Sequence, residues 1–140
     1  MENLLSKNED LGKLILRVTV GGLMIFHGTH KLIHGHDFIR FHLKEHDLPE
    51  WFSLGVPVGE VIAPMLLLLG LFTRIASVLV IITMLISIWL FYGAEAFLLG
   101  KYGGLNSELN LFFLLTSFAI LFIGAGNYSL TEVIRRNTKE

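Results

Sequence analysis

Hydrophobic residues gather into long blocks that are separated by polar segments. The blocks cover about residues 11–33, 54–72, 75–92 and 109–123. A helix needs about 20 apolar residues to cross a hydrocarbon core of roughly 30 Å, and these blocks approach or reach that length. The pattern therefore predicts an all-α integral membrane protein, a four-helix bundle formed by a single transmembrane domain over residues 1–140.

Two shorter segments mix polar and apolar residues and predict helices at the membrane surface. The first lies in the polar stretch 34–50, where Phe38 and Leu43 keep an apolar component, and Trp51 follows as an interfacial anchor. The second follows Ser129-x-x-Glu132, which resembles a capping box at the start of a helix. We expect one short surface helix in the first loop and another at the C-terminus.

Composition agrees with a membrane protein and limits the chemistry. The chain is 53% hydrophobic and 16% charged, and its net charge of -1 gives no attraction to nucleic acid. It has no cysteine, which excludes a disulfide, a thiol nucleophile and a cysteine-ligated iron–sulfur cluster within the chain. Redox chemistry would therefore need a cofactor or a protein partner.

The basic residues divide unequally between the two sides of the predicted bundle. One side holds the loop residues Lys31, Arg40, Lys44 and Lys101. The side with the termini holds more of them, namely Lys7, Lys13, Arg17, Arg74, Arg135, Arg136 and Lys139. The positive-inside rule then predicts a multi-pass protein of a bacterial or archaeal inner membrane with both termini in the cytoplasm.

Polar residues from three predicted helices fall at the same depth near the outer side. The candidate ligand-binding residues are His27, His30, Lys31, Glu60, Glu108 and Asn110. Glu60 lies within the hydrocarbon depth, where a carboxylate needs a partner or a proton. Two interpretations stay open: the layer binds a ligand or handles protons, or Glu60 forms an ion pair with Lys31 or His27 that only holds the helices together.

Other polar groups carry weaker predictions. A metal site of His27, His30 and His34 with Glu60 or Glu108 is chemically feasible, but no recognised ligand spacing supports it, so no metal is predicted. At the cytoplasmic face, Arg17, Arg74 and Tyr128 could bind an anion or lipid head groups. Ordinary snorkelling of the arginines to the interface is the alternative.

The order of short motifs resembles a known family. The motifs are residues 17–22, His27-Gly28-x-x-Lys31, Glu60 with Pro64, Leu69-Gly70-Leu71-x-x-Arg74, Glu108-x-Asn110 and Gly124-x-Gly126-x-Tyr128-Ser129-Leu130. From about residue 11 to residue 130 the chain resembles the DoxX family of small four-helix membrane proteins. That resemblance implies a link to quinone-linked sulfur oxidation and to membrane oxidoreductase complexes, although the histidine-rich first loop matches no common pattern.

Two classes of function follow. In the first, the protein is a membrane subunit of a redox complex that holds a quinone or a quinone-like ligand near the outer leaflet, between the first, second and fourth helices. It has no built-in cofactor, so a protein partner would supply the electrons, and whether the chain itself is an enzyme stays open.

In the second, it is a non-enzymatic scaffold or partner-binding subunit whose polar layer is structural. A solute-transport role has less support, because four spans would have to form a homo-oligomer to enclose a path and no inverted repeat is evident. A cavity around Glu60 would favour the first class, and a closely packed layer the second.

Overall fold

The structure is a computed structural model that describes residues 2–138, without the side chains of residues 2–7 and of His36. Within this range the protein is helical, and no β-strand is formed. Its elements are α1 (Glu2–His34), α2 (His36–Glu45), η1 (Glu50–Leu54), α3 (Gly55–Pro57), η2 (Val58–Ile62), α4 (Ala63–Leu69), α5 (Thr73–Phe91), η3 (Gly93–Phe97), α6 (Glu108–Ile123) and α7 (Leu130–Asn137). The expected all-α class is confirmed.

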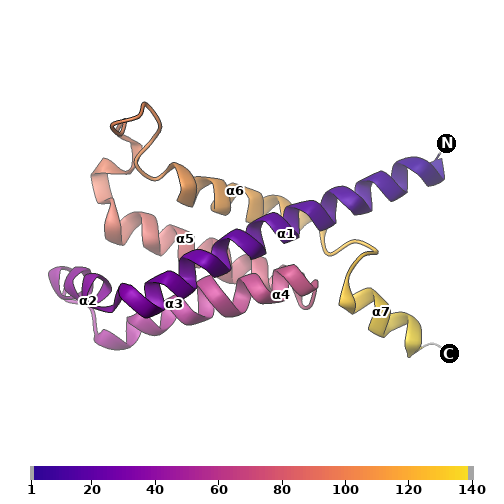
Figure 1. Ribbon diagram of the computed structural model, residues 1–140, viewed down its shortest axis with the longest axis horizontal. Helices are drawn as coiled ribbons and strands as arrows, with labels where there is room; N and C mark the ends of the chain where they lie inside the picture. Colours follow the sequence, from indigo (N-terminus) through magenta and orange to yellow (C-terminus); the bar gives the residue numbers. More distant parts are fainter. Residues whose placement is uncertain (1, 139–140) are drawn as a thin grey trace.

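Successive helices run back and forth between two ends of the molecule. Figure 1 shows α1 running from the N-terminus to α2, α3 and α4 returning, α5 crossing again, and α6 leading back to α7. Both termini therefore lie at one end, here called the terminal end. The opposite end, here called the α2 end, holds α2 and the loop between α5 and α6.

Three segments are long and apolar enough to cross a membrane: Asn8–His34, Glu50–Leu69 and Thr73–Phe91. They match the first three predicted spans, although the first helix begins well before residue 11. The apolar helix at the fourth predicted position, α6, has 16 residues. At 1.5 Å per residue it is about 24 Å long, which is short for a hydrocarbon core of roughly 30 Å.

The core lies where the long helices meet. α5 packs against α6, and α1 packs against α4. The buried apolar side chains are Val20, Met24, Ala63, Leu67, Ala76, Val80, Ile81, Met84, Phe113, Leu114 and Ile120. Large apolar residues such as Phe26, Leu115 and Phe122 point outward instead. An apolar core with an apolar exterior is the arrangement expected of helices surrounded by lipid.

A π-helical turn interrupts the second segment and carries Glu60. The turn covers Val58–Ile62, directly before α4. Pro64 has no N–H group, so the carbonyl oxygen of Glu60 cannot receive the usual hydrogen bond from four residues further along. Single π turns of this kind occur often at functional sites. The sequence predicted a helix with prolines here, but not the change of helical pitch.

The two short helices form where they are expected. α2 buries Ile39 and Leu43 against Leu90 of α5, so part of its apolar side faces the protein. At the start of α7, the Ser129 hydroxyl accepts a hydrogen bond from the Glu132 N–H, which confirms the N-cap. Lys139 lies outside the described residues, and so do the side chains of Lys7 and His36.

Candidate functional site

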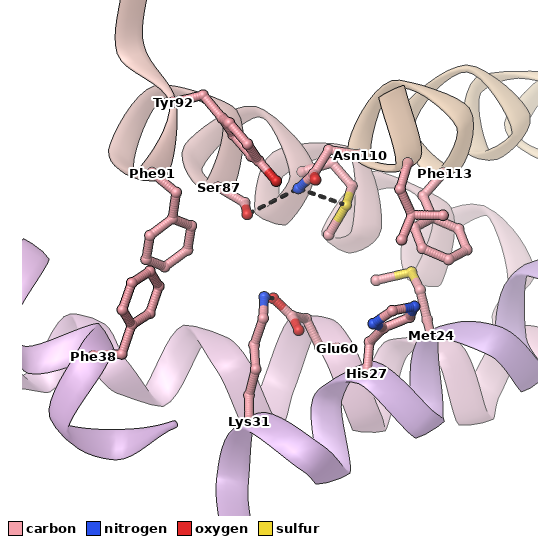
Figure 2. A pocket seen from close by; sticks show the side chains of 12 residues that line it. Met24, His27, Lys31, Phe38, Glu60, Ser87, Phe91, Tyr92, Asn110 and Phe113 are labelled. Carbon is pink, nitrogen blue, oxygen red and sulfur yellow. Dashed lines mark hydrogen bonds and ion pairs between the residues drawn. The ribbon is translucent and has the colours of Figure 1, made fainter. Parts of the chain in front are cut away.

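A cavity of about 360 Å³ opens between the helices near the α2 end. Its walls come from α1, α2, η2, α5 and α6, together with the residue that follows α5. The lining residues are Met24, His27, Lys31, Phe38, Glu60, Met84, Ser87, Phe91, Tyr92, Leu109, Asn110 and Phe113. The cavity therefore places polar groups from separate helices around one space (Figure 2).

An ion pair forms one side of the cavity. The Lys31 Nζ and Glu60 Oε1 atoms are 2.6 Å apart. Glu60 is only 3% exposed, whereas about a third of the Lys31 side chain remains accessible. The pair joins the last turns of α1 to the π turn. Burying the carboxylate is tolerable because the ammonium group lies in direct contact with it.

Glycines allow α1 to approach the segment that carries Glu60. A Cβ atom on Gly28 would collide with the backbone carbonyl of Glu60, and one on Gly21 would lie 2.6 Å from the Pro64 carbonyl oxygen. Gly21 and Gly28 are seven residues apart and so share one face of α1. Small residues at such contacts let helix backbones approach closely. This contact fixes the depth at which Glu60 meets Lys31.

Polar groups of α5 and α6 face the ion pair across the cavity. The Asn110 Nδ2 atom donates to Ser87 Oγ at 2.9 Å and lies 3.8 Å from the Met84 sulfur. Figure 2 shows Ser87, Tyr92 and Asn110 together on this side. The bond to Ser87 uses the amide NH₂ group and leaves the Asn110 carbonyl oxygen for other partners. Hydroxyl and amide groups thus oppose the charged pair.

Aromatic rings close the two remaining sides. Phe38 of α2 stacks on Phe91 of α5 with ring centroids 5.3 Å apart, and the Lys31 Nζ atom lies 5.5 Å from the Phe91 ring centre. On the other side, the rings of His27 and Phe113 pack in a T-shaped arrangement with centroids 6.1 Å apart. Apolar and aromatic walls with a few polar groups are typical of pockets for small-molecule ligands.

The structure brings together four of the six candidate residues, namely His27, Lys31, Glu60 and Asn110. His30 does not line the cavity; its ring packs on His34 with centroids 4.9 Å apart. Glu108 does not line it either, and its carboxylate lies over Gly104 in the α5–α6 loop. The structure therefore groups His27, Lys31 and Glu60 around the cavity, whereas the Glu108 side chain at the first turn of α6 lies against the loop.

The feasible metal site receives no support from the geometry. Among the described residues, no group of three histidine, aspartate or glutamate side chains is close enough to hold a metal ion. His27 contacts Phe113, whereas His30 and His34 contact each other.

Sequence reasoning missed the contribution of the third apolar block. Ser87, Phe91 and Tyr92 line the cavity, although none of them was a candidate site residue. Met24 and Met84 also line it and had no assigned role. The only signal for Ser87 was a hydroxyl residue inside an otherwise apolar block, which is too common in membrane helices to indicate a site.

A second polar cluster lies at the terminal end and is centred on Arg17. The Arg17 side chain is fully buried, and it donates hydrogen bonds to the carbonyl oxygens of Leu67, at 3.2 Å, and Tyr128. Leu67 lies in the last turn of α4, where the helix dipole favours a positive charge. Arg17 therefore does not snorkel to the interface, and the Tyr128 backbone, rather than its ring, contacts the guanidinium group.

The elements around Arg17 are held by further contacts. Gly70 has φ +72°, and a Cβ atom there would collide with the Arg17 guanidinium. The Thr131 hydroxyl donates to the Gly70 carbonyl oxygen at 2.7 Å. Within α7, the Arg135 guanidinium donates to Glu132 at 2.8 Å, which lowers the pKa of Glu132. Arg74 is exposed and takes no part in this cluster.

Comparison with known protein families shows which family the chain belongs to. The family model described as DoxX matches residues 12–93, which is more than half of the chain. The chain belongs to the DoxX family. It is a multi-pass membrane protein whose helices lie in a lipid environment. No curated protein and no solved structure matched the chain.

The family match covers most of the site of this DoxX protein. It contains the ion pair, the π turn, Ser87 and Tyr92, together with Arg17 at the other end. It ends before α6, so Asn110, Phe113 and the Tyr128 carbonyl lie outside it. The matched helices therefore supply one complete side of the cavity and part of the side that faces it.

Proposed function

We propose that this DoxX protein is a membrane subunit of a redox complex and that it binds a quinone or a quinone-like ligand in the cavity beside Glu60. The observation that carries this proposal is the pair of opposed polar sides. Lys31, Glu60 and His27 lie on one side, and Ser87, Tyr92 and Asn110 face them (Figure 2). A quinone ring carries its two carbonyl oxygens at opposite edges, so it can accept hydrogen bonds from both sides at once.

Charge and size support the same ligand class. Lys31 and Glu60 neutralise each other, so the cavity favours a neutral ligand over an ion. A volume of about 360 Å³ is near the lower end of the range for ligand pockets, which suits one ring rather than a large cofactor. The rings of Phe38, Phe91 and Phe113 offer flat surfaces for stacking.

The chemistry assigned to the site is proton transfer and orientation. Reduction of a quinone to a quinol takes up two electrons and two protons. His27 and Glu60 are groups that can give or receive a proton at a ligand oxygen. The chain contains no cysteine to hold an iron–sulfur cluster, so the electrons would come from a protein partner. In this proposal the ligand-binding subunit and the electron donor are separate chains.

The proposed placement in the membrane has four crossings. α1, the segment from η1 to α4, α5 and α6 would each cross, with α2 and α7 at the two surfaces. The excess of basic residues near the termini favours cytoplasmic termini in a bacterial or archaeal inner membrane. The cavity would then lie near the outer leaflet. The exposed Arg74 and Tyr128 would meet lipid head groups or another anion on the inner side.

The ligand proposal is tested by matched serine substitutions on α5. Ser87→Ala removes a cavity hydroxyl, whereas Ser77→Ala removes a buried hydroxyl that bonds Thr73 at the other end of the same helix. We expect Ser87→Ala to weaken quinone binding about tenfold, the effect of losing a hydrogen bond of roughly 1.4 kcal/mol. Ser77→Ala should leave it unchanged. The measurement is titration of purified protein with decylubiquinone, together with mass spectrometry of copurified quinones.

The scaffold alternative is supported by the same ion pair, because Lys31 and Glu60 tie α1 to η2. The scaffold alternative predicts that substitutions in this ion pair lower the stability of the protein and leave ligand binding unchanged. Glu60→Gln leaves the partly accessible Lys31 without its counter-charge, whereas Lys31→Met leaves a buried carboxylate, so Lys31→Met should cost more, about 3 kcal/mol. If the parent protein binds no quinone, or if Ser87→Ala and Glu60→Gln bind it as the parent does, the ligand proposal is wrong and the scaffold is favoured.

A further inference from the structure

The loop between α5 and α6 exposes a cluster of large apolar side chains. Phe97 and Leu98 are more than half exposed, Leu99 is 73% exposed and Tyr102 is 94% exposed. This group, Phe97–Leu99 with Tyr102, is here called the loop patch. Contiguous apolar surface of this kind marks a site that meets either another protein or a membrane.

The backbone of the loop forms many of its hydrogen bonds within the loop. The Gly100 N–H donates to the Gly104 carbonyl at 2.7 Å, and the Asn106 N–H donates to the Leu98 carbonyl at 3.0 Å. The Ser107 hydroxyl and the Asn106 amide donate to the carbonyls of Ala96 and Glu95. Non-helical backbone is costly in lipid unless its polar groups are paired. This loop therefore meets an important requirement for lying at the edge of the hydrocarbon.

The position of the loop suits contact with lipid. Figure 1 shows it projecting sideways from the axis of the long helices rather than extending beyond α2. It leads directly into α6, whose outward side carries Phe112 and Leu115. The loop patch therefore lies in the segment directly before a helix that exposes apolar side chains.

The length of α6 supplies the physical reason for such a contact. Its 16 residues span about 24 Å, several ångströms less than a hydrocarbon core of roughly 30 Å. A helix that is too short must thin the bilayer or be extended by flanking groups. Lys101 lies 5.8 Å from the Tyr102 ring centre, and both residue types are suited to the interface with water.

We propose that the loop patch inserts into the interfacial region of the bilayer and anchors the start of α6 in lipid. The occupant of this surface is the bilayer itself, not a second protein. The proposal rests on α6 crossing the membrane, and it is independent of any ligand in the cavity. Backbone hydrogen bonds among Gly100, Gly103 and Gly104 close a tight turn beside the loop patch, and Gly103 has φ +85°.

The test uses single cysteines, which the chain allows because it has none of its own. Leu99→Cys carries a nitroxide spin label in the loop patch, Leu115→Cys carries one on the exposed side of α6, and Lys44→Cys carries one on the polar side of α2. The proteins are reconstituted in vesicles of palmitoyl-oleoyl phosphatidylcholine. Collision of each label with oxygen, which concentrates in lipid, is compared with collision with a water-soluble nickel chelate.

We expect the oxygen-to-nickel ratio at Leu99 to be severalfold higher than at Lys44 and closer to the ratio at Leu115. A nickel-accessible label at Leu99 beside a lipid-exposed label at Leu115 overturns the loop proposal alone. A label at Leu99 that neither reagent reaches shows a protein contact, such as a second copy, and also overturns it. A nickel-accessible label at Leu115 instead overturns the fourth crossing.

Discussion

Arg17 lies in an environment unlike that of a surface arginine. Its guanidinium group is buried and bonds two backbone carbonyls in different parts of the chain. A lysine has one donor group and cannot reproduce the planar fork that reaches both oxygens. The role of Arg17 is therefore positional, and its size and shape matter as well as its charge.

We predict that Arg17→Lys lowers the stability of the protein by about 2–3 kcal/mol, because charge-assisted hydrogen bonds are lost in a buried setting. The matched control is Arg74→Lys, which changes an exposed arginine at the same end. Melting temperature in mild detergent measures both. Equal melting temperatures for the two variants would contradict the role assigned to Arg17.

Individual polar residues were only partly predictable. The sequence named Lys31 and His27 as alternative partners of Glu60, because helical spacing and depth bring both near it, and the structure forms the ion pair with Lys31. It could not place Glu108 or His30, since one turn of helix decides whether a side chain faces the cavity or leaves it. Arg17 looked like a snorkelling residue because its acceptors are backbone carbonyls, which leave no mark in the sequence.

At the level of elements, the contact between α1 and the π turn depends on glycine. Gly28 faces the Glu60 backbone so closely that a methyl group does not fit. A Cβ atom added to Gly12, on the same helix, would have no neighbouring atom within 4 Å. The two glycines are therefore a matched pair for testing helix packing.

We predict that Gly28→Ala destabilises the protein by about 1–3 kcal/mol, the usual cost of overpacking. It should also weaken any ligand binding, because α1 and the π turn must separate and Lys31 shifts relative to Glu60. Gly12→Ala should be neutral or slightly stabilising, since alanine favours helix more than glycine does. Detergent melting curves of the two variants check this, and a harmless Gly28→Ala would refute the close contact.

Helices were the most predictable elements and their irregularities the least. Hydrophobic blocks of sufficient length located α1, the segment around α4, α5 and α6, because lipid favours only long apolar helices. The π turn lies between Pro57 and Pro64, neither of which can donate a backbone hydrogen bond to the preceding turn. The burial of Ile39 and Leu43 depends on the position of α5. Both are settled by packing between segments, which hydrophobic pattern does not encode.

For the whole molecule, the proposed topology places both ends of the chain on one side of the membrane. Figure 1 shows the two termini at the same end of the helices. The basic residues near that end favour the cytoplasm, although the difference between the two ends is modest.

We predict that an alkaline phosphatase fusion after Lys44 is active, since it lies in the periplasm, whereas a green fluorescent protein fusion after Glu140 fluoresces in the cytoplasm. The reverse result at both positions would invert the orientation but keep the crossings. Fusion points after Arg74 and Lys101 provide the matched internal checks. A fusion after Lys101 on the same side as Arg74 would contradict a crossing by α5.

The two ends of the molecule are fastened in different ways, and this has a mechanical consequence. At the terminal end, a guanidinium group joins α1, α4 and the segment before α7 by directional bonds. At the α2 end, the ion pair and the amide–hydroxyl hydrogen bond described above join α1 to η2 and α6 to α5. Between these two joined pairs, the ring of Phe38 stacks on Phe91 without a directional bond. We expect the two pairs to separate more readily at this end than at the terminal end, so that a ligand arriving from the lipid enters between Phe38 and Phe91.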